Sequence, residues 1–137
     1  MSSNIFVAAD THSRKIEFES QSDDLFIMCG DWEQGEVNTK AKKILVSGNH
    51  DMFPTDIWDF VADGILLKHI WFTHEPAFTL PLGAYWNVHG HTHYHNPTEL
   101  GYPKKVWHRA LPPNQILLLE KFMFEENEKL TEDEKWR

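Results

Sequence analysis

Five short apolar segments dominate this sequence, and each is followed by a corner that contains Asp, Asn or His. The segments span residues 5–9, 25–29, 44–47, 70–72 and 84–88, and the corners begin at Asp10, Gly30, Gly48, Thr73 and His89. Short apolar runs rich in β-branched and aromatic residues are typical of buried strands. The sequence therefore predicts a fold built on buried strands, with polar side chains gathered where the strands end.

The segments between these runs include stretches that are compatible with helices. They span residues 13–22, 36–43 and 57–62, and a clearer helix is predicted over residues 116–129 after a start at residues 112–115. Alternating strands and helices favour an α/β domain. A length of 137 residues suits one domain over residues 1–137, with a charged C-terminal helix or tail from about residue 113.

The charge balance limits the classes of partner. The chain has 13 basic and 21 acidic residues, and its formal net charge is −8. Binding of long nucleic acid without sequence preference needs a basic surface, so this partner is disfavoured. A small phosphoester substrate remains open, because bound cations would make an acidic site locally positive. A homo-oligomer also remains open.

Three sequence features bear on the compartment. No apolar run approaches the roughly 18 residues of a membrane span. The first residues lack the basic and apolar stretches of a secretory signal. The single cysteine, Cys29, cannot form an internal disulfide, which fits a reducing compartment. We therefore expect a cytoplasmic protein with no membrane partner.

The polar corners supply a set of side chains that commonly bind metals. The set consists of Asp10, His12, Asp31, Asn49, His74, His91 and His93. Imidazoles mixed with carboxylates suit Mn, Fe, Co, Ni or Zn better than Mg or Ca. Seven ligands are too many for one tetrahedral ion but enough for two ions if one carboxylate bridges them, and Asp31 is the natural bridge. Asp10 and His12 are two residues apart, so in an extended chain their side chains would point to the same side.

Four of the ligand candidates have a simpler explanation when each is considered alone. Asp10 and Asp31 are also typical of turns that follow strands, and Asn49 is typical of a left-handed turn. A single His74 is most easily explained as a core residue. The complete set, with its paired histidines, favours metal binding. Gly30, Gly48 and Gly90 precede or adjoin ligand candidates, and glycine lets the backbone turn sharply and approach a metal or phosphate closely.

The ordered motifs resemble those of the calcineurin-like metallophosphoesterases. They stand here as Asp10-Thr11-His12, Gly30-Asp31, Gly48-Asn49-His50-Asp51, His74 and Gly90-His91-Thr92-His93. The resemblance spans residues 5–93, about two-thirds of the chain. It implies a compact sandwich of two mixed β-sheets flanked by helices. It also implies two divalent metal ions, for which Mn is the first choice and Fe, Zn, Ni or Co are alternatives.

The resemblance further implies a division of roles. Asp10, His12, Asp31 and His93 would hold one ion, and Asp31, Asn49, His74 and His91 would hold the other. His50 would face the substrate, where a protonated imidazole could stabilise charge or donate a proton to the leaving oxygen. Asp51 is a candidate to orient His50. Two neighbouring ions lower the pKa of a bridging water and so supply hydroxide for attack on phosphorus.

Departures from related motifs narrow the expected substrate. Protein serine/threonine phosphatases of this superfamily extend the second motif to G-D-x-x-D-R-G, whereas Gln34 and Gly35 replace the later Asp and Arg here. The short chain is similar to small stand-alone members, whose usual substrates are phosphodiesters. A small or cyclic nucleotide-like phosphodiester is therefore the predicted substrate. A phosphomonoesterase and a non-catalytic metal-binding scaffold are the alternative functions. Trp32, next to Asp31, is a candidate to line the substrate site.

Overall fold

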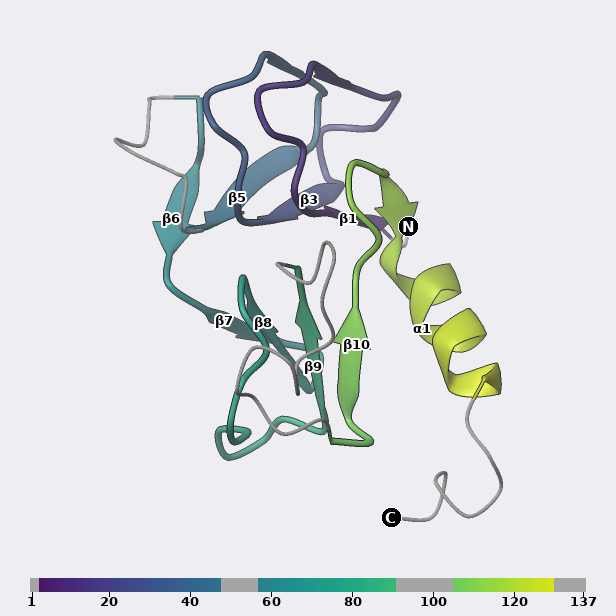
Figure 1. Ribbon diagram of the computed structural model, residues 1–137. Coiled ribbons are helices and arrows are strands. Elements are labelled where there is room, and N and C mark those ends of the chain that lie inside the picture. Colours follow the sequence, from purple (N-terminus) through teal and green to yellow (C-terminus); the bar gives the residue numbers. More distant parts are fainter. Residues whose placement is uncertain (1–2, 48–56, 91–104, 130–137) are drawn as a thin grey trace.

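The protein is mostly β in the computed structural model, which describes residues 3–47, 57–90 and 105–129. Within these ranges, 36% of the residues lie in strands and 10% lie in one α-helix (Figure 1). The α/β class and the sandwich flanked by helices, both predicted from the sequence, are therefore wrong.

The largest sheet has five strands in the order β11-β1-β3-β5-β6. Their bounds are Ile5–Ala8 for β1, Leu25–Cys29 for β3, Lys42–Val46 for β5, Phe60–Ala62 for β6 and Leu117–Leu118 for β11. Neighbouring strands from β1 to β6 are parallel, and β11 runs antiparallel to β1. Parallel pairing requires a crossover after each strand.

Strands replace helices in these crossovers. The chain passes through β2 (Ile16–Glu17) after β1 and through β4 (Val37–Asn38) after β3, and β2 and β4 pair in parallel. The chain therefore winds in stacked turns, which is a β-solenoid arrangement. Residues 15–19 alternate basic or acidic residues with apolar ones, a two-residue period that favours a strand over a helix.

The three internal helices predicted from the sequence are wrong for this reason. Residues 13–22 contain β2, residues 36–43 contain β4 and the start of β5, and residues 57–62 contain β6. Ile16 is buried while Glu17 is exposed, so successive side chains of β2 point to opposite faces, as in a strand. Pairing with neighbouring strands stabilises these segments in the extended conformation more than their weak helix propensity stabilises a helix.

The second sheet has four strands in the order β10-β9-β8-β7. Their bounds are Ile65–Leu67 for β7, Ile70–Thr73 for β8, Trp86–His89 for β9 and His108–Ala110 for β10. Strands β8, β9 and β10 are parallel, and β7 is antiparallel to β8. This sheet lies below the five-stranded sheet in Figure 1. The strands predicted from the five apolar segments are confirmed, with ends that differ by a few residues.

The C-terminal helix prediction is confirmed in part. Helix α1 spans Leu119–Glu128, so it begins several residues after the predicted start. The residues just before it, Leu117–Leu118, form β11 and pair with β1 instead. Leu119 and Phe122 anchor the buried face of α1. In the described part of the chain, no helix has both the length and the apolar character needed to cross a membrane.

Two apolar clusters cover the two faces of the five-stranded sheet. The first joins Val7 and Ile27 of this sheet to Phe72 and Val88 of the second sheet. The second cluster lies on the other face and includes Phe26, Met28, Leu45, Trp32 and Trp58. Strands that are buried on both faces consist of continuous apolar residues, as in a parallel sheet. This packing holds the strands in place, and with them the ends from which the polar corners begin.

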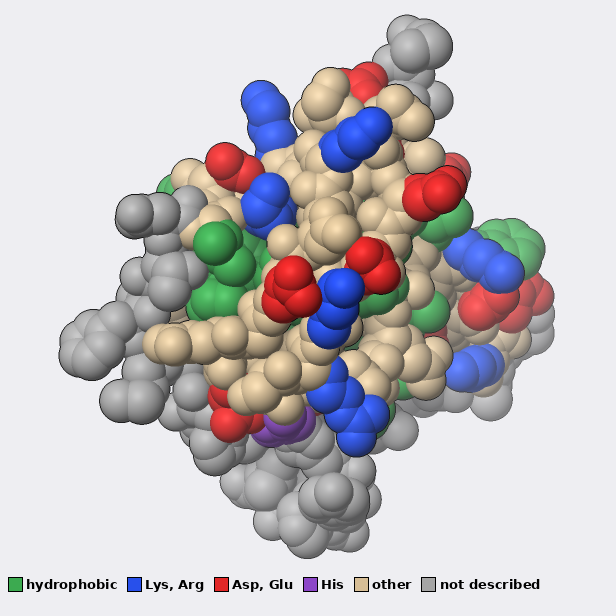
Figure 2. Space-filling view, turned by 90° about the horizontal axis from the view of Figure 1, so that it is seen from above, with side chains coloured by type: hydrophobic (Ala, Val, Ile, Leu, Met, Phe, Trp, Pro, Cys, Tyr) green, Lys and Arg blue, Asp and Glu red, His purple; other side chains and the backbone are tan. Residues whose placement is uncertain are grey.

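Charges of both signs are interspersed on the face that Figure 2 shows, which lies above the five-stranded sheet. Lys15, for example, lies 3.6 Å from Glu17 and 3.7 Å from Glu36, with each distance joining the amine to a carboxylate oxygen. All three side chains are more than half exposed. Exposed ion pairs of this kind contribute little to stability, typically about 0–1 kcal/mol each.

Asp24 ties the start of β3 to the N-terminal segment and gives a first prediction. Its carboxylate accepts hydrogen bonds from the backbone N–H groups of Gln21 at 2.8 Å and Asn4 at 2.9 Å. These bonds hold the pKa of Asp24 below its ordinary value of 3.8. A depressed pKa means that ionised Asp24 stabilises the fold above about pH 4, and that this contribution is lost as the pH falls through the folded-state pKa. Asp24→Asn should therefore unfold at lower urea concentration than the wild type at neutral pH.

The difference between Asp24→Asn and the wild type should narrow as the pH falls through the folded-state pKa of Asp24, because the wild-type carboxyl then also becomes neutral. Asp23→Asn, at the exposed neighbouring position, is the control and should change stability little at either pH. Equal loss of stability in both variants would show that removal of a negative charge from this segment, and not loss of the two backbone hydrogen bonds, is responsible.

Candidate metal centre

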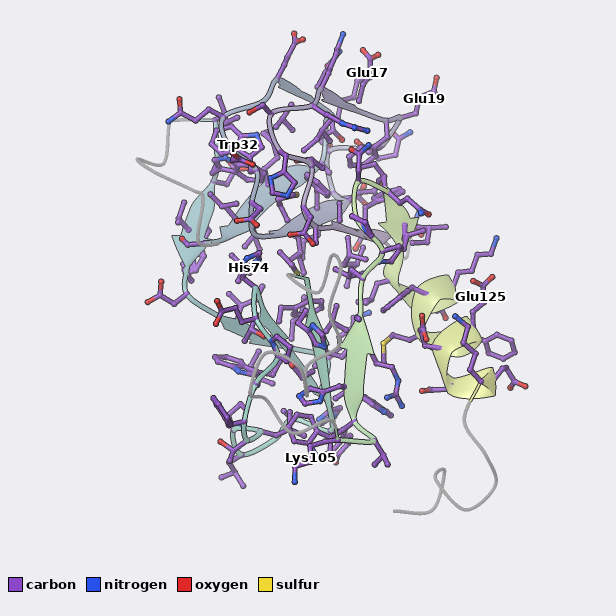
Figure 3. All side chains as sticks on the ribbon, viewed as in Figure 1. Glu17, Glu19, Trp32, His74, Lys105 and Glu125 are labelled. Carbon is purple, nitrogen blue, oxygen red and sulfur yellow. The ribbon has the colours of Figure 1, made fainter. Side chains whose placement is uncertain are left out.

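Three buried side chains meet where strands of the two sheets end. Asp10 lies two residues beyond β1, Asp31 lies two residues beyond β3, and His74 directly follows β8. One ligand atom from each lies within 4.8 Å of the ligand atoms of the other two. Figure 3 shows His74 at the level between the two sheets. Since β1 and β3 are parallel neighbours, their carboxyl ends place both carboxylates at one edge, where sites of parallel sheets commonly form.

The Asp31 carboxylate faces two imidazoles. Its Oδ2 atom lies 3.4 Å from Nε2 of His74 and 3.9 Å from Nε2 of His12. The Asp31 side chain is fully buried, the His74 side chain is 4% exposed, and the His12 side chain is 39% exposed. One buried oxygen therefore stands between a buried and a half-exposed imidazole, which is an arrangement suited to bridging two cations.

The ring of His74 is oriented by the backbone of β3. Nδ1–H of His74 donates a hydrogen bond to the carbonyl oxygen of Cys29 at 3.0 Å, which turns Nε2 towards Asp31. Burial is the largest single influence on the pKa of His74 and lowers it. The hydrogen bonds to Asp31 and Cys29, together with the negative charges of Asp31 and Asp10, outweigh burial and raise the pKa above its ordinary value. The site therefore favours a positive charge at this position.

Gly30 makes the approach of His74 possible. A Cβ atom on Gly30 would lie 2.1 Å from Nδ1 of His74, and the φ angle of Gly30 is +84°. On the other side of the site, a Cβ atom on Gly90 would lie 2.9 Å from Oδ2 of Asp10. These two glycines therefore let the backbone lie close to the His74 and Asp10 side chains, while Gly48 lies outside the described residues.

The loops after β1 and β3 run side by side beyond the sheet. The N–H groups of Asp10 and His12 donate to the carbonyl oxygens of Gly30 at 3.0 Å and Asp31 at 2.9 Å. Asp10, His12 and Asp31 have φ angles of 57°, 46° and 56°. Left-handed backbone at non-glycine residues is uncommon and clusters at functional sites. The expectation of an extended chain from Asp10 to His12 is wrong, because β1 ends at Ala8 and the chain turns.

Four of the seven predicted metal ligands, Asp10, His12, Asp31 and His74, are thus brought together. The other three, Asn49, His91 and His93, lie outside the described residues. The two predicted catalytic residues, His50 and Asp51, also lie outside them.

Glu33 is a site residue that the sequence did not reveal. Its Oε2 atom contacts Nδ1 of His12. Glu33 lies two residues beyond Asp31, and the contact depends on the left-handed turn that follows β3, with a φ angle of 54° at Glu33 itself. Local spacing gives no sign of such a turn, so the carboxylate resembled an ordinary exposed acid.

Trp32 belongs to the core and not to a substrate site. It is 2% exposed, and its indole N–H donates to the carbonyl oxygen of Gly35 at 2.8 Å. Its ring packs edge-on against Trp58, with ring centres 5.1 Å apart. The prediction that Trp32 forms a wall of the substrate site is therefore wrong.

Two further groups beside the site stay uncharged. Burial raises the pKa of the Cys29 thiol far above its usual value, and the negative charge of Asp10 raises it further. Burial lowers the pKa of His89 to about 4. In the described residues, the ligand atoms that lie together belong to Asp10, Asp31 and His74 and not to Cys29, so the donors are carboxylate oxygens and imidazole nitrogen.

The donor set fits a transition-metal ion. Two carboxylates and two imidazoles suit Mn, Fe, Co, Ni or Zn, whereas Mg and Ca prefer oxygen alone. Comparison with family models, with curated proteins and with solved structures found no match. The chemistry of the site, together with the ordered motifs, is therefore the basis for a functional proposal.

Proposed function

We propose that this protein is a dinuclear metal-dependent phosphoesterase that hydrolyses a small phosphodiester. The observation that carries the proposal is the position of Asp31, whose Oδ2 atom faces Nε2 of both His12 and His74. A buried carboxylate between two imidazoles is suited to share two cations. The proposal extends the ligand set to Asn49, His91 and His93, and assigns the substrate-facing role to His50 with Asp51 as its neighbour.

The described residues have distinct roles in this proposal. Asp10, His12, Asp31 and His74 would hold the metal, which when bound would lower the pKa of a water and neutralise charge on the phosphate. Burial of Asp31 and His74 keeps water away and so strengthens electrostatic interactions at the site. The Cys29 carbonyl holds the His74 ring in one orientation, as carbonyl groups commonly do for metal-binding histidines.

Manganese is the ion that we propose first, with Fe, Zn, Ni or Co as alternatives that suit the same donors. Cytoplasmic location is part of the proposal, and the buried free thiol of Cys29 is consistent with a reducing compartment. The net charge of −8 favours a small substrate over long nucleic acid.

Hydrolysis of paired chromogenic substrates tests this proposal. Metal-stripped protein should cleave neither a bis-nitrophenyl phosphate nor a nitrophenyl phosphate. Added Mn²⁺ should restore cleavage of the diester in preference to the monoester. The kcat/KM ratio for the two substrates is the measurement.

The other outcomes separate the alternatives. Preferential cleavage of the monoester would make the protein a phosphomonoesterase. Tight metal binding without cleavage of any phosphoester in a wide panel would favour a metal-binding scaffold. Absence of divalent metal binding in calorimetry would exclude the proposal altogether.

A further inference from the structure

Glu33 and His12 form a side-chain pair at the exposed rim of the metal centre. Oε2 of Glu33 contacts Nδ1 of His12, and the side chains are 30% and 39% exposed, respectively. A carboxylate can only accept a hydrogen bond, so Nδ1 of His12 carries the proton in this contact. The other ring nitrogen, Nε2, then faces Oδ2 of Asp31 at 3.9 Å.

We infer that Glu33 is a positioning residue that fixes the tautomer and orientation of His12 for metal binding. The inference rests on the proposed function, since it assigns His12 to one of the two ions. Histidines that bind metals commonly donate their second N–H to a carboxylate or a carbonyl, and loss of that partner typically costs about 10–100-fold in metal affinity. Glu33 supplies such a carboxylate from within this chain.

The arrangement at His74 supports this inference independently. Nδ1 of His74 donates to the Cys29 carbonyl, and its Nε2 faces the same Oδ2 atom of Asp31. Both imidazoles therefore have Nδ1 occupied and Nε2 directed at one shared oxygen. His74 obtains its partner from the backbone inside the core, whereas His12 is half exposed and obtains its partner from the Glu33 side chain.

Backbone contacts hold Glu33 in place against His12. Ser13 donates its N–H to the carbonyl oxygen of Trp32 and its hydroxyl to the carbonyl oxygen of Glu33, each at 2.9 Å. The buried Trp32 ring anchors the same loop to the core. The carboxylate of Glu33 is therefore held near the imidazole by its own backbone, and less entropy is lost when the pair forms.

The pairing predicts that the two ions differ in their sensitivity to Glu33. His12 is 39% exposed and would hold its ion at the rim, whereas the buried His74 would hold the other ion deeper in the site. Glu33 contacts His12 and should therefore affect the first ion alone. Its carboxylate would also add negative charge near that ion and so increase the affinity further.

Calorimetric titration of the metal-stripped full chain with Mn²⁺ tests the inference. In Glu33→Gln, one of the two binding events should weaken by about 10–100-fold while the other stays within about twofold of the wild type. Glu36→Gln is the matched control, because it removes the same charge from the same loop and its carboxylate lies near Lys15 instead. This control should bind both ions as the wild type does.

A second measurement determines the tautomer of His12 directly. Nitrogen-15 NMR of metal-free wild-type protein should show the His12 proton on Nδ1, and Glu33→Gln should shift His12 towards a mixture of tautomers. A proton on Nε2 in the wild type overturns the inference. Equal Mn²⁺ affinities in Glu33→Gln and the wild type, or joint loss of both events with a lower melting temperature, also overturn it.

These outcomes are distinct from those for the proposed function. Wild-type protein that binds two ions but cleaves no phosphoester removes the function and leaves the role of Glu33 intact. Unchanged metal binding in Glu33→Gln removes the role of Glu33 and leaves the function intact.

Discussion

Asp31→Asn should lower the affinity for Mn²⁺ by more than about 100-fold, which exceeds the usual effect of losing a residue that only orients a ligand. The amide keeps the size of the side chain but removes the negative charge and one of the two equivalent oxygens. Phosphodiester cleavage should fall by at least about 10²–10³-fold, because a shared bridge is needed by both ions. Calorimetry and steady-state kinetics on the same protein preparation measure the two effects.

The histidine next to Asp31 provides a readout that is independent of activity. In metal-free wild-type protein, Asp31 is the main group that raises the pKa of His74, against the lowering effect of burial. In Asp31→Asn burial remains and the negative charge of Asp31 is gone, so the pKa of His74 should be lower than in the wild type. A His with a raised pKa stabilises the fold below its unfolded-state pKa and loses this contribution as pH rises through the folded-state pKa. Asp31→Asn should lack this stabilisation.

Asp63→Asn is the matched control for charge, since Asp63 is exposed in the turn between β6 and β7. It should keep metal affinity, activity and the titration of His74. Wild-type Mn²⁺ affinity in Asp31→Asn would falsify the bridging role of Asp31, whatever the effect on catalysis.

The strands could be predicted from the sequence because apolar runs have to be buried. Residues 25–29 form the central strand β3, and both faces of this strand contact a core cluster. The crossovers could not be predicted in the same way. Strands β2 and β4 are two residues each and are stabilised by pairing with each other across about twenty positions in sequence. The local pattern of apolar and polar residues contains little information about a pair so distant in sequence, so helices were expected in these two segments instead.

The candidate site shows the same division between local and distant causes. Asp10, Asp31 and His74 could be identified because each follows an apolar run, and strands place their ends together. The groups that orient the imidazoles could not be identified. The Cys29 carbonyl reaches His74 only because the two sheets share a core cluster, and Glu33 reaches His12 only through left-handed turns. Both causes belong to the tertiary structure.

Gly30→Ala should damage both stability and metal binding. A left-handed φ angle costs an alanine about 1–2 kcal/mol. The new Cβ would also lie 2.1 Å from Nδ1 and 2.4 Å from Cγ of His74, so the ring has to move and its bond to the Cys29 carbonyl is lost. Overpacking of this kind adds about 1–3 kcal/mol. We therefore expect the free energy of unfolding to fall by roughly 2–5 kcal/mol in urea titrations, together with weaker binding of Mn²⁺.

Gly83→Ala separates the two causes. The φ angle of Gly83 is +93°, but a Cβ atom there would meet only Leu66, at an ordinary contact distance of 3.7 Å. This variant should show the backbone cost of about 1–2 kcal/mol alone, with unchanged metal affinity. The difference in the free energy of unfolding between the two variants then measures the cost of displacing the His74 ring from its position against Gly30. If Gly30→Ala lost no more stability than Gly83→Ala and still bound Mn²⁺ normally, the close packing of His74 on Gly30 would have no role in forming the site.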